Sequence, residues 1–280
     1  MIEENPNDDV LFSAEYFSTF QALEHLPKVA ADLREFDFDV RTVMFVRNQV
    51  DQLSSLYAQR IKLLNMTLSF DQALRHSKNM DRADWLRAYQ SHVAQGWTPH
   101  IGAYGRGNKM PIVKAFFEIA GLIDRLPPET DFSVADVNPS FGSIGVLVGL
   151  HVSRHLADIG KKVPHDANVY FGRCLIAASA EVGDDRFIGH DASDLAYIRE
   201  RYAEGNSAIA KLLPDDEADL LLTEKLPEGP TSPRSFSELN RSDFQRAEAC
   251  MELLRSKMLA YERLHIYLPR EMITQIPRIG

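Results

Sequence analysis

Apolar side chains recur along the chain with two periods, and the change of period predicts the elements. Residues Val40–Val46 read VRTVMFV, a β-branched, apolar run typical of a buried strand in a parallel sheet. Over Gln49–Leu64 the apolar positions instead fall on one face of a helix. A shorter apolar run at Val10–Ser13 precedes a helical pattern over Glu15–Phe38, with Pro27 at a joint. This repeated order predicts an α/β fold with a central, mostly parallel sheet flanked by helices.

Helical patterns dominate the remainder of the chain. Ser69 is expected to cap a short helix, and Gly102–Lys109 (GAYGRGNK) to form a glycine-rich loop. Longer helices are expected at Asp81–Gly96, Ile112–Leu122, Ile144–Leu156, Ala192–Leu213 and Arg241–Leu264. The proline-rich stretch Leu226–Pro233 predicts a linker. We therefore expect a helix-rich second half, with an α/β domain over 1–225 and a C-terminal helical extension over 226–280.

Composition narrows the classes of function. The chain has 280 residues, of which 45% are hydrophobic, enough to bury a sizeable core. A net charge of −9 argues against a general nucleic-acid binder, so an anion site has to be built locally from a few cations. No apolar run approaches the roughly 18–20 residues that span a bilayer, and the acidic N-terminus is unlike a secretory signal. A cytoplasmic protein is therefore expected.

Metal binding is not expected from the cysteines and histidines. Cys174 and Cys250 have neither CxxC spacing nor paired histidines, and a reduced chain is the simpler interpretation, although the spacing leaves a disulfide open. His151 and His155 stand four residues apart, but without an HExxH glutamate this is a weak zinc pattern. His190, with Asp191 and Asp194 after it, indicates a helix N-cap rather than a catalytic cluster.

Arg47 and Ser55 are the candidate ligands for a phosphate. Arg47 directly follows the strand Val40–Val46, and ligands of open α/β sheets bind at the carboxyl ends of strands. A guanidinium there can bind a phosphate with two parallel hydrogen bonds. Ser55 lies two helical turns further on and can donate to the same group. The alternative is that Arg47 forms a surface ion pair at the helix start and that Ser55 is a small packing residue.

Glu15 is the candidate general base. It closes the run Leu11–Glu15, and if that strand is parallel to Val40–Val46 it emerges at the same edge as Arg47. The alternative is a first-turn glutamate that the helix dipole favours.

The segment Val40–Lys62 (VRTVMFVRNQVDQLSSLYAQRIK) resembles the 3′-phosphate-binding segment of sulfotransferases, closest to a bacterial sulfotransferase-like family. That segment is a strand ending in arginine, then a helix with serine eight positions later, often followed by tyrosine. Further stretches resemble the same family in order, and the resemblance covers roughly residues 11–225: Phe12–Ser18 (FSAEYFS), Ser69–Leu74 (SFDQAL), Ile112–Leu122 (IVKAFFEIAGL), Val137–Gly142 (VNPSFG) and Ile198–Lys211 (IRERYAEGNSAIAK).

The resemblance implies a P-loop-type α/β fold and 3′-phosphoadenosine 5′-phosphosulfate as the sulfuryl donor. It places Arg47 and Ser55 on the 3′-phosphate of the donor and Glu15 near the position of a catalytic base. The acceptor would be a hydroxyl or amine of a glycan, a lipid or a small molecule. Sulfuryl transfer, like phosphoryl transfer, depends mainly on in-line positioning and on stabilising charge.

The sequence departs from the family at the loop like GxPKTGTT, which wraps the 5′-phosphosulfate and is not found here. The expectation is an N-terminally shortened chain, a chain that has lost the chemistry, or a partner that supplies the loop. An uncovered sheet edge then leads us to expect a homodimer or poor solubility. The alternative function is a non-catalytic nucleotide-binding or scaffold protein on the same fold.

Overall fold

The computed structural model describes residues 20–76, 81–105, 111–133, 141–223, 231–259 and 268–269. Its α-helices and strands are, in chain order, α1 (Phe20–Glu35), β1 (Val43–Val46), α2 (Gln49–Lys62), α3 (Phe70–Leu74), α5 (Trp85–Val93), β2 (His100–Ala103), α6 (Ile112–Ile119), α7 (Ser143–Asp158), α8 (His165–Glu181), α9 (Ala192–Ala210), α10 (Asp215–Leu222) and α11 (Arg241–Leu259). Short 3₁₀ turns lie at Asp81–Ala83, Ile123–Arg125 and Phe236–Glu238.

The strands β1 and β2 pair in parallel, with Val43 opposite His100 and Val46 opposite Ala103. A parallel sheet with helices around it agrees with the predicted α/β class, although the described part of the sheet has two strands. The prediction that Gly102–Lys109 is a loop was wrong at its first two residues, which complete β2. The strand was missed because HIGA is short and contains glycine, and its conformation depends on pairing with β1.

The outer edge of β2 is covered by a side chain. The hydrogen bonds from His100 N to Thr42 O and from Tyr104 N to Val46 O show which backbone groups face β1. The N–H of Ala103 therefore points the other way, where it donates to Glu217 Oε2 of α10 at 2.6 Å. A carboxylate at this position occupies an edge donor that a further strand would otherwise use.

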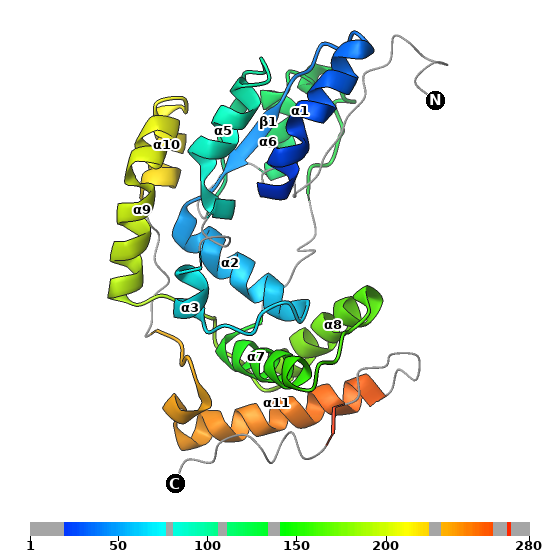
Figure 1. Ribbon diagram of the computed structural model, residues 1–280, viewed down its shortest axis with the longest axis vertical. Coiled ribbons are helices and arrows are strands. Elements are labelled where there is room, and N and C mark those ends of the chain that lie inside the picture. The colour runs from blue at the N-terminus through cyan, green and yellow to red at the C-terminus, as the bar shows by residue number, and fades with distance from the viewer. Residues whose placement is uncertain are drawn as a thin grey trace.

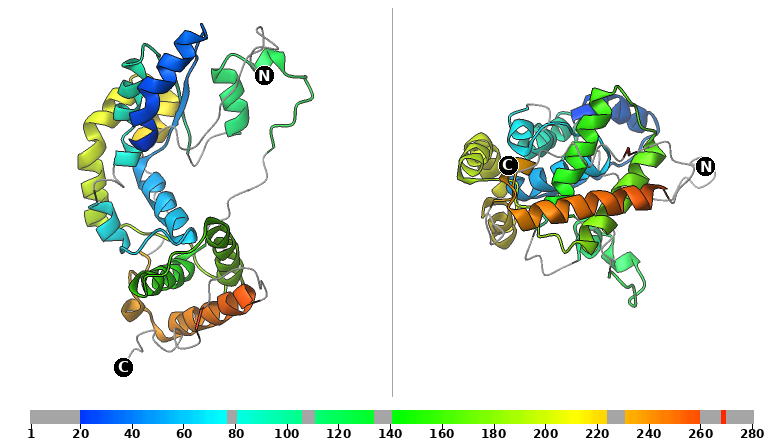
Figure 2. Two further views of the ribbon diagram at one scale, coloured as in Figure 1. Left: turned by 45° about the vertical axis from the view of Figure 1, so that its right-hand side comes forward. Right: turned by 90° about the horizontal axis from the view of Figure 1, so that it is seen from below.

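The sheet and the helical bundle lie at opposite ends of the molecule (Figure 1). The sheet is accompanied by α1, α5 and α6, whereas α7, α8 and α11 form the other end, and α2 runs between the two. The helices α9 and α10 run along one side (Figures 1 and 2). The second half of the described chain is helical, as predicted.

Two hydrophobic clusters form the core, and α9 contributes to both. The larger cluster joins α2, α3, α7, α8, α9 and α11, and the smaller joins β1, β2, α5, α9 and α10. On α9, Ile198 and Tyr202 belong to the larger cluster and Ile209 to the smaller. The chain also passes from the smaller cluster at Val46 to the larger at Val50 within one strand–helix turn. That turn is therefore held by both cores.

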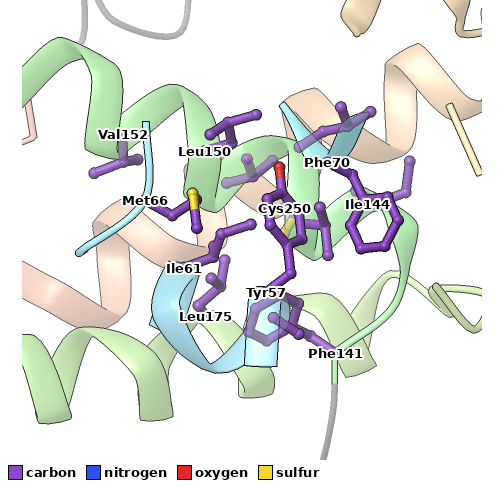
Figure 3. Packing of buried hydrophobic residues seen from close by; sticks show 14 of the residues in the cluster. Tyr57, Ile61, Met66, Phe70, Phe141, Ile144, Leu150, Val152, Leu175 and Cys250 are labelled. Carbon is purple, nitrogen blue, oxygen red and sulfur yellow. The ribbon is translucent and has the colours of Figure 1, made fainter. Parts of the chain in front are cut away.

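The close packing of α2 on α7 depends on a glycine. A Cβ at Gly149 would lie 2.4 Å from Ile61 Cγ2, so a larger residue would force the two helices apart. Figure 3 shows Tyr57 and Ile61 of α2 among core residues such as Leu150 and Leu175. Cys250 of α11 lies in the same cluster, so the C-terminal helix shares the core of the preceding residues.

The helix α1 differs from the prediction of two pieces joined at Pro27. It is continuous from Phe20 to Glu35, and Pro27 lies inside it on the exposed side. A proline removes one helical hydrogen bond, and the exposed position leaves the unpaired carbonyl within reach of water. The predicted strand Val10–Ser13 lies outside the described residues.

A buried carboxylate joins the first half of the chain to its C-terminal segment. Asp194 of α9 is fully buried and pairs with Arg75 Nη1 at 3.3 Å and with Arg234 Nη2 at 2.5 Å. Arg234 also pairs with Asp191. Asp191 is the N-cap of α9, which confirms the helix N-cap predicted around His190. The pKa of Asp191 is lowered mainly by the hydrogen bond that it accepts from the backbone N–H of Asp194. The two arginines thus neutralise a charge that burial would otherwise disfavour.

Replacing Asp194 by alanine is expected to lower the free energy of unfolding by about 2–3 kcal/mol. This is less than for a fully enclosed pair because the Arg75 side chain is half exposed. Urea denaturation measures the loss. The matched control is Asp185→Ala, whose exposed carboxylate pairs with Arg246 and should contribute less than about 1 kcal/mol. Equal losses for the two variants would contradict the assignment.

Cys174 and Cys250 are free and buried, so the native protein is expected to resist thiol reagents. Burial raises the pKa of Cys250 to about 12, which leaves almost no thiolate at neutral pH. Ellman's reagent at pH 8 should report essentially no thiol in the native protein and both thiols in guanidinium chloride. Rapid reaction of the folded protein, or loss of both thiols without added reductant, would contradict this.

Candidate anion-binding site

The strand–helix turn Arg47–Gln49 lies at the carboxyl end of β1, where the sequence placed a phosphate site. Asn48 caps α2, and its Oδ1 accepts the N–H of Val50 at 3.0 Å. The N-terminal end of a helix carries partial positive charge, which favours an anion. The turn therefore has the location and the polarity that anion binding at a parallel strand requires.

Two side-chain hydrogen bonds from distant elements hold Arg47 and Asn48. The indole Nε1 of Trp85 donates to the backbone carbonyl of Arg47 at 2.7 Å. The amide Nδ2 of Asn48 donates to the carbonyl of Leu221 at 2.8 Å. These partners belong to α5 and α10, and both helices contribute to the smaller core cluster. The turn is therefore attached to that cluster by two hydrogen bonds.

Gln49 makes the third attachment. Its side chain forms a reciprocal amide pair with Asn206 of α9: Gln49 Nε2 donates to Asn206 Oδ1 at 2.7 Å, and Asn206 Nδ2 donates to Gln49 Oε1 at 2.8 Å. Gln49 Nε2 also donates to the carbonyl of Ala83 at 3.3 Å. Three successive residues are thus held by α5, α9, α10 and the turn at Asp81–Ala83. We call this set of hydrogen bonds the turn clamp.

The guanidinium of Arg47 has unused hydrogen-bonding capacity. Its Nε is buried and has no hydrogen-bond partner among the described residues. Its Nη2 lies 3.8 Å from Asp51 Oδ2, a distance too long for a hydrogen bond. The Arg47 side chain as a whole is 25% exposed. Buried donors without partners are rare in folded proteins, and a bound anion is one way to satisfy this one.

Asp51 was not predicted as a contact of Arg47. The contact with Asp51 agrees with the alternative that Arg47 forms an ion pair at the helix start. That Arg47 binds a phosphate stays a prediction. The four-residue spacing from Arg47 to Asp51 is a signal that could have revealed the pair. An incoming phosphate has to compete with the Asp51 carboxylate for the guanidinium.

Ser55 is exposed and lies one turn beyond Asp51 on the same side of α2. The alternative that it is a packing residue is therefore wrong, and its hydroxyl is open to solvent. The Asp51 carboxylate stands between Arg47 and Ser55 along the helix. Arg47 precedes α2 and Ser55 lies within it, and the described residues show no direct contact between the two.

Glu15, the predicted base, lies outside the described residues. Two other carboxylates lie near this end of the sheet: Asp51 faces Arg47, and Glu217 accepts the N–H of Ala103. The tyrosine of the motif, Tyr57, is buried and donates to the carbonyl of Leu68 at 3.0 Å. Burial raises its pKa, so Tyr57 is a core residue that stays protonated.

Two of the described histidines make contacts with other parts of the fold. His151 packs edge to face against Phe236, and the buried His190 lies 3.5 Å from Ser54 Oγ through its Nδ1. Within the described ranges, no group of three or more histidine, cysteine, aspartate or glutamate side chains is arranged to hold a metal ion. In the same residues, no helix combines the length and the apolar character that a membrane crossing needs.

Known proteins offer no closer guide to this arrangement. Comparison of the chain with family models, with curated proteins and with solved structures returned no match.

Proposed function

We propose that the chain binds the 3′-phosphate of an adenine nucleotide at the turn Arg47–Gln49, as the donor 3′-phosphoadenosine 5′-phosphosulfate would require. The observation that carries the proposal is the Arg47 guanidinium, whose buried Nε has no partner in the described residues, at the junction of a parallel strand and a helix N-terminus. The sulfotransferase-like pattern over Val40–Lys62 supplies the identity of the ligand.

A phosphate suits the charge and shape of this turn. A guanidinium can offer two parallel N–H groups to two phosphate oxygens, and the resulting charge-assisted hydrogen bonds are among the stronger ones in proteins. A phosphate dianion carries more charge than the Asp51 carboxylate, whose contact with Arg47 is long. In this proposal the phosphate displaces Asp51, and the exposed hydroxyl of Ser55 donates to it from the next turn.

In a complete reaction the acceptor hydroxyl or amine attacks the sulfur atom in line with the leaving phosphate. Glu15 would take the acceptor proton, and the S–O bond to the nucleotide would break, leaving adenosine 3′,5′-bisphosphate. We propose a glycan, a lipid or a small molecule as acceptor, and a P-loop-type sheet as the frame. The turn clamp would keep the 3′ end of the nucleotide fixed during transfer.

A non-catalytic nucleotide-binding or scaffold protein on the same fold is the second candidate. It is favoured by the two described carboxylates near the strand ends, since Asp51 contacts Arg47 and Glu217 accepts a backbone N–H. Both carboxylates are thus engaged in contacts other than those of a general base with an acceptor. Incubation of the purified chain with ³⁵S-labelled donor and pooled glycans, lipids and peptides separates the candidates. Steady transfer of label eliminates the second one.

Replacing Arg47 by alanine is expected to weaken binding of adenosine 3′,5′-bisphosphate at least about tenfold, since a hydrogen bond to a charged group contributes about 1.5–3 kcal/mol. Isothermal titration calorimetry measures the affinity, and thermal shift confirms folding. The matched control is Arg41→Ala at the other end of the strand, where Arg41 forms an exposed pair with Asp39. Wild-type protein that shows neither heat nor thermal shift at millimolar nucleotide would refute the proposal.

Replacing Asp51 by asparagine is expected to strengthen nucleotide binding by about threefold, because a partly exposed ion pair contributes at most about 1 kcal/mol and Arg47 would no longer be shared. Stability should fall slightly, since aspartate is favoured in the first turn of α2. The control Asp39→Asn removes an equal charge away from the turn. Weaker binding by Asp51→Asn would mean that Asp51 helps the ligand rather than competing with it.

A further inference from the structure

We propose that the amide pair between Gln49 and Asn206 positions Arg47 for phosphate binding, so that Asn206 of α9 acts on the site without touching the ligand. This inference rests on the proposed function. It assigns a positioning role to Asn206, which is 157 positions from Gln49 in the sequence.

The burial of Gln49 makes its partners obligatory. Gln49 is the first residue of α2, stands two residues after Arg47 and is only 2% exposed. A buried amide that loses its hydrogen bonds has no water to replace them, and it either destabilises the protein or moves to find other partners. With Asn206 in place, both the donor and the acceptor of the Gln49 side chain are used. The first turn of α2 therefore has one preferred position.

The direction of the bonds distinguishes this pair from apolar packing. A reciprocal amide pair constrains both the distance and the relative rotation of the two side chains, whereas apolar contacts constrain mainly the distance. Binding groups have to be held within about 0.5 Å and 10–20° of a productive geometry. The neighbouring carbonyl of Arg47 accepts one hydrogen bond from Trp85, and the Asn48 side chain makes one hydrogen bond to α10, at Leu221, besides its cap bond to Val50. The Gln49 pair adds the attachment that fixes rotation about these points.

The helix α9 is a firm support for this attachment. Its N-terminus is capped by Asp191 and joined to Arg75 and Arg234 through the buried Asp194. Ile209, three residues after Asn206, is fully buried in the smaller cluster. Asn206 therefore sits between two fixed parts of α9. A change at Asn206 should loosen the turn without displacing the helix that carries it.

The test compares two nucleotides in each variant. The measured quantity is the ratio of the Kd for adenosine 5′-monophosphate to the Kd for adenosine 3′,5′-bisphosphate, which isolates the 3′-phosphate contact. In the wild type this ratio should be at least about ten, from the strength of a charged hydrogen bond. Calorimetry on the full chain gives both constants, and thermal denaturation gives the stability of each variant.

Four variants separate positioning from stability. Asn206→Leu should lower both the thermal stability and the ratio, the latter at least fivefold. Gln49→Leu combined with Asn206→Leu replaces both amides, so it should recover part of the stability, while the lost hydrogen bond to the Ala83 carbonyl keeps it below wild type and the ratio stays low. Gln49→Asn combined with Asn206→Gln swaps the amides and should restore the ratio. The control Ser179→Ala removes a hydrogen bond to Asp184 in the other core and should lower stability at an unchanged ratio.

A wild-type ratio in the double leucine variant would overturn the inference, because the turn would then need only packing. A ratio that falls in Ser179→Ala in step with stability would overturn it as well. If Asn206→Leu does not fold, the double leucine and swapped variants decide the matter alone. A ratio near one in the wild type refutes the proposed function itself, and with it this inference. A high wild-type ratio that no amide variant changes refutes the inference only.

Discussion

The three residues that follow β1 hold this structure together, because both core clusters meet at them. Val46 belongs to the smaller cluster and Val50 to the larger, and the polar groups of Arg47, Asn48 and Gln49 lie between. Polar groups at such a depth need partners. They find them on α5, α9, α10 and the turn at Asp81–Ala83, so four segments scattered along the sequence converge on one strand–helix junction.

Much of the fold followed from local sequence patterns. The amphipathic period of α2, the N-cap at Ser69 and the N-cap at Asp191 are short-range signals, and the structure confirms them. The strand β2 and the helices α8 and α10 were not predicted. β2 depends on its pairing with β1, whereas α8 and α10 each begin directly after a proline and lack the side-chain N-cap that would reveal a helix start. The predicted strand at Val10–Ser13 and the base Glu15 stay predictions.

The candidate site was predictable only in part. The position of Arg47 after a strand and the spacing to Ser55 are visible in the sequence, and so is the four-residue spacing to Asp51 that was overlooked. The partners that hold the turn are not visible, because Trp85, Asn206 and Leu221 are 38, 157 and 173 residues from the groups they bind. A single sequence carries no local signal for contacts at that separation. The residues of the turn were therefore visible in the sequence, whereas the groups that hold the turn were not.

The glycine at position 149 has a consequence for the opposite end of α2. The helix has 14 residues and is therefore about 20 Å long, with Ile61 near one end resting on α7 and the candidate site at the other. If α2 moves as a rigid body, a sideways displacement of one end tilts the whole helix. Small shifts in how α7 and α2 pack would thus appear as a tilt of the guanidinium relative to the strand ends. A larger residue at position 149 would therefore press on the helix whose other end begins at the candidate turn.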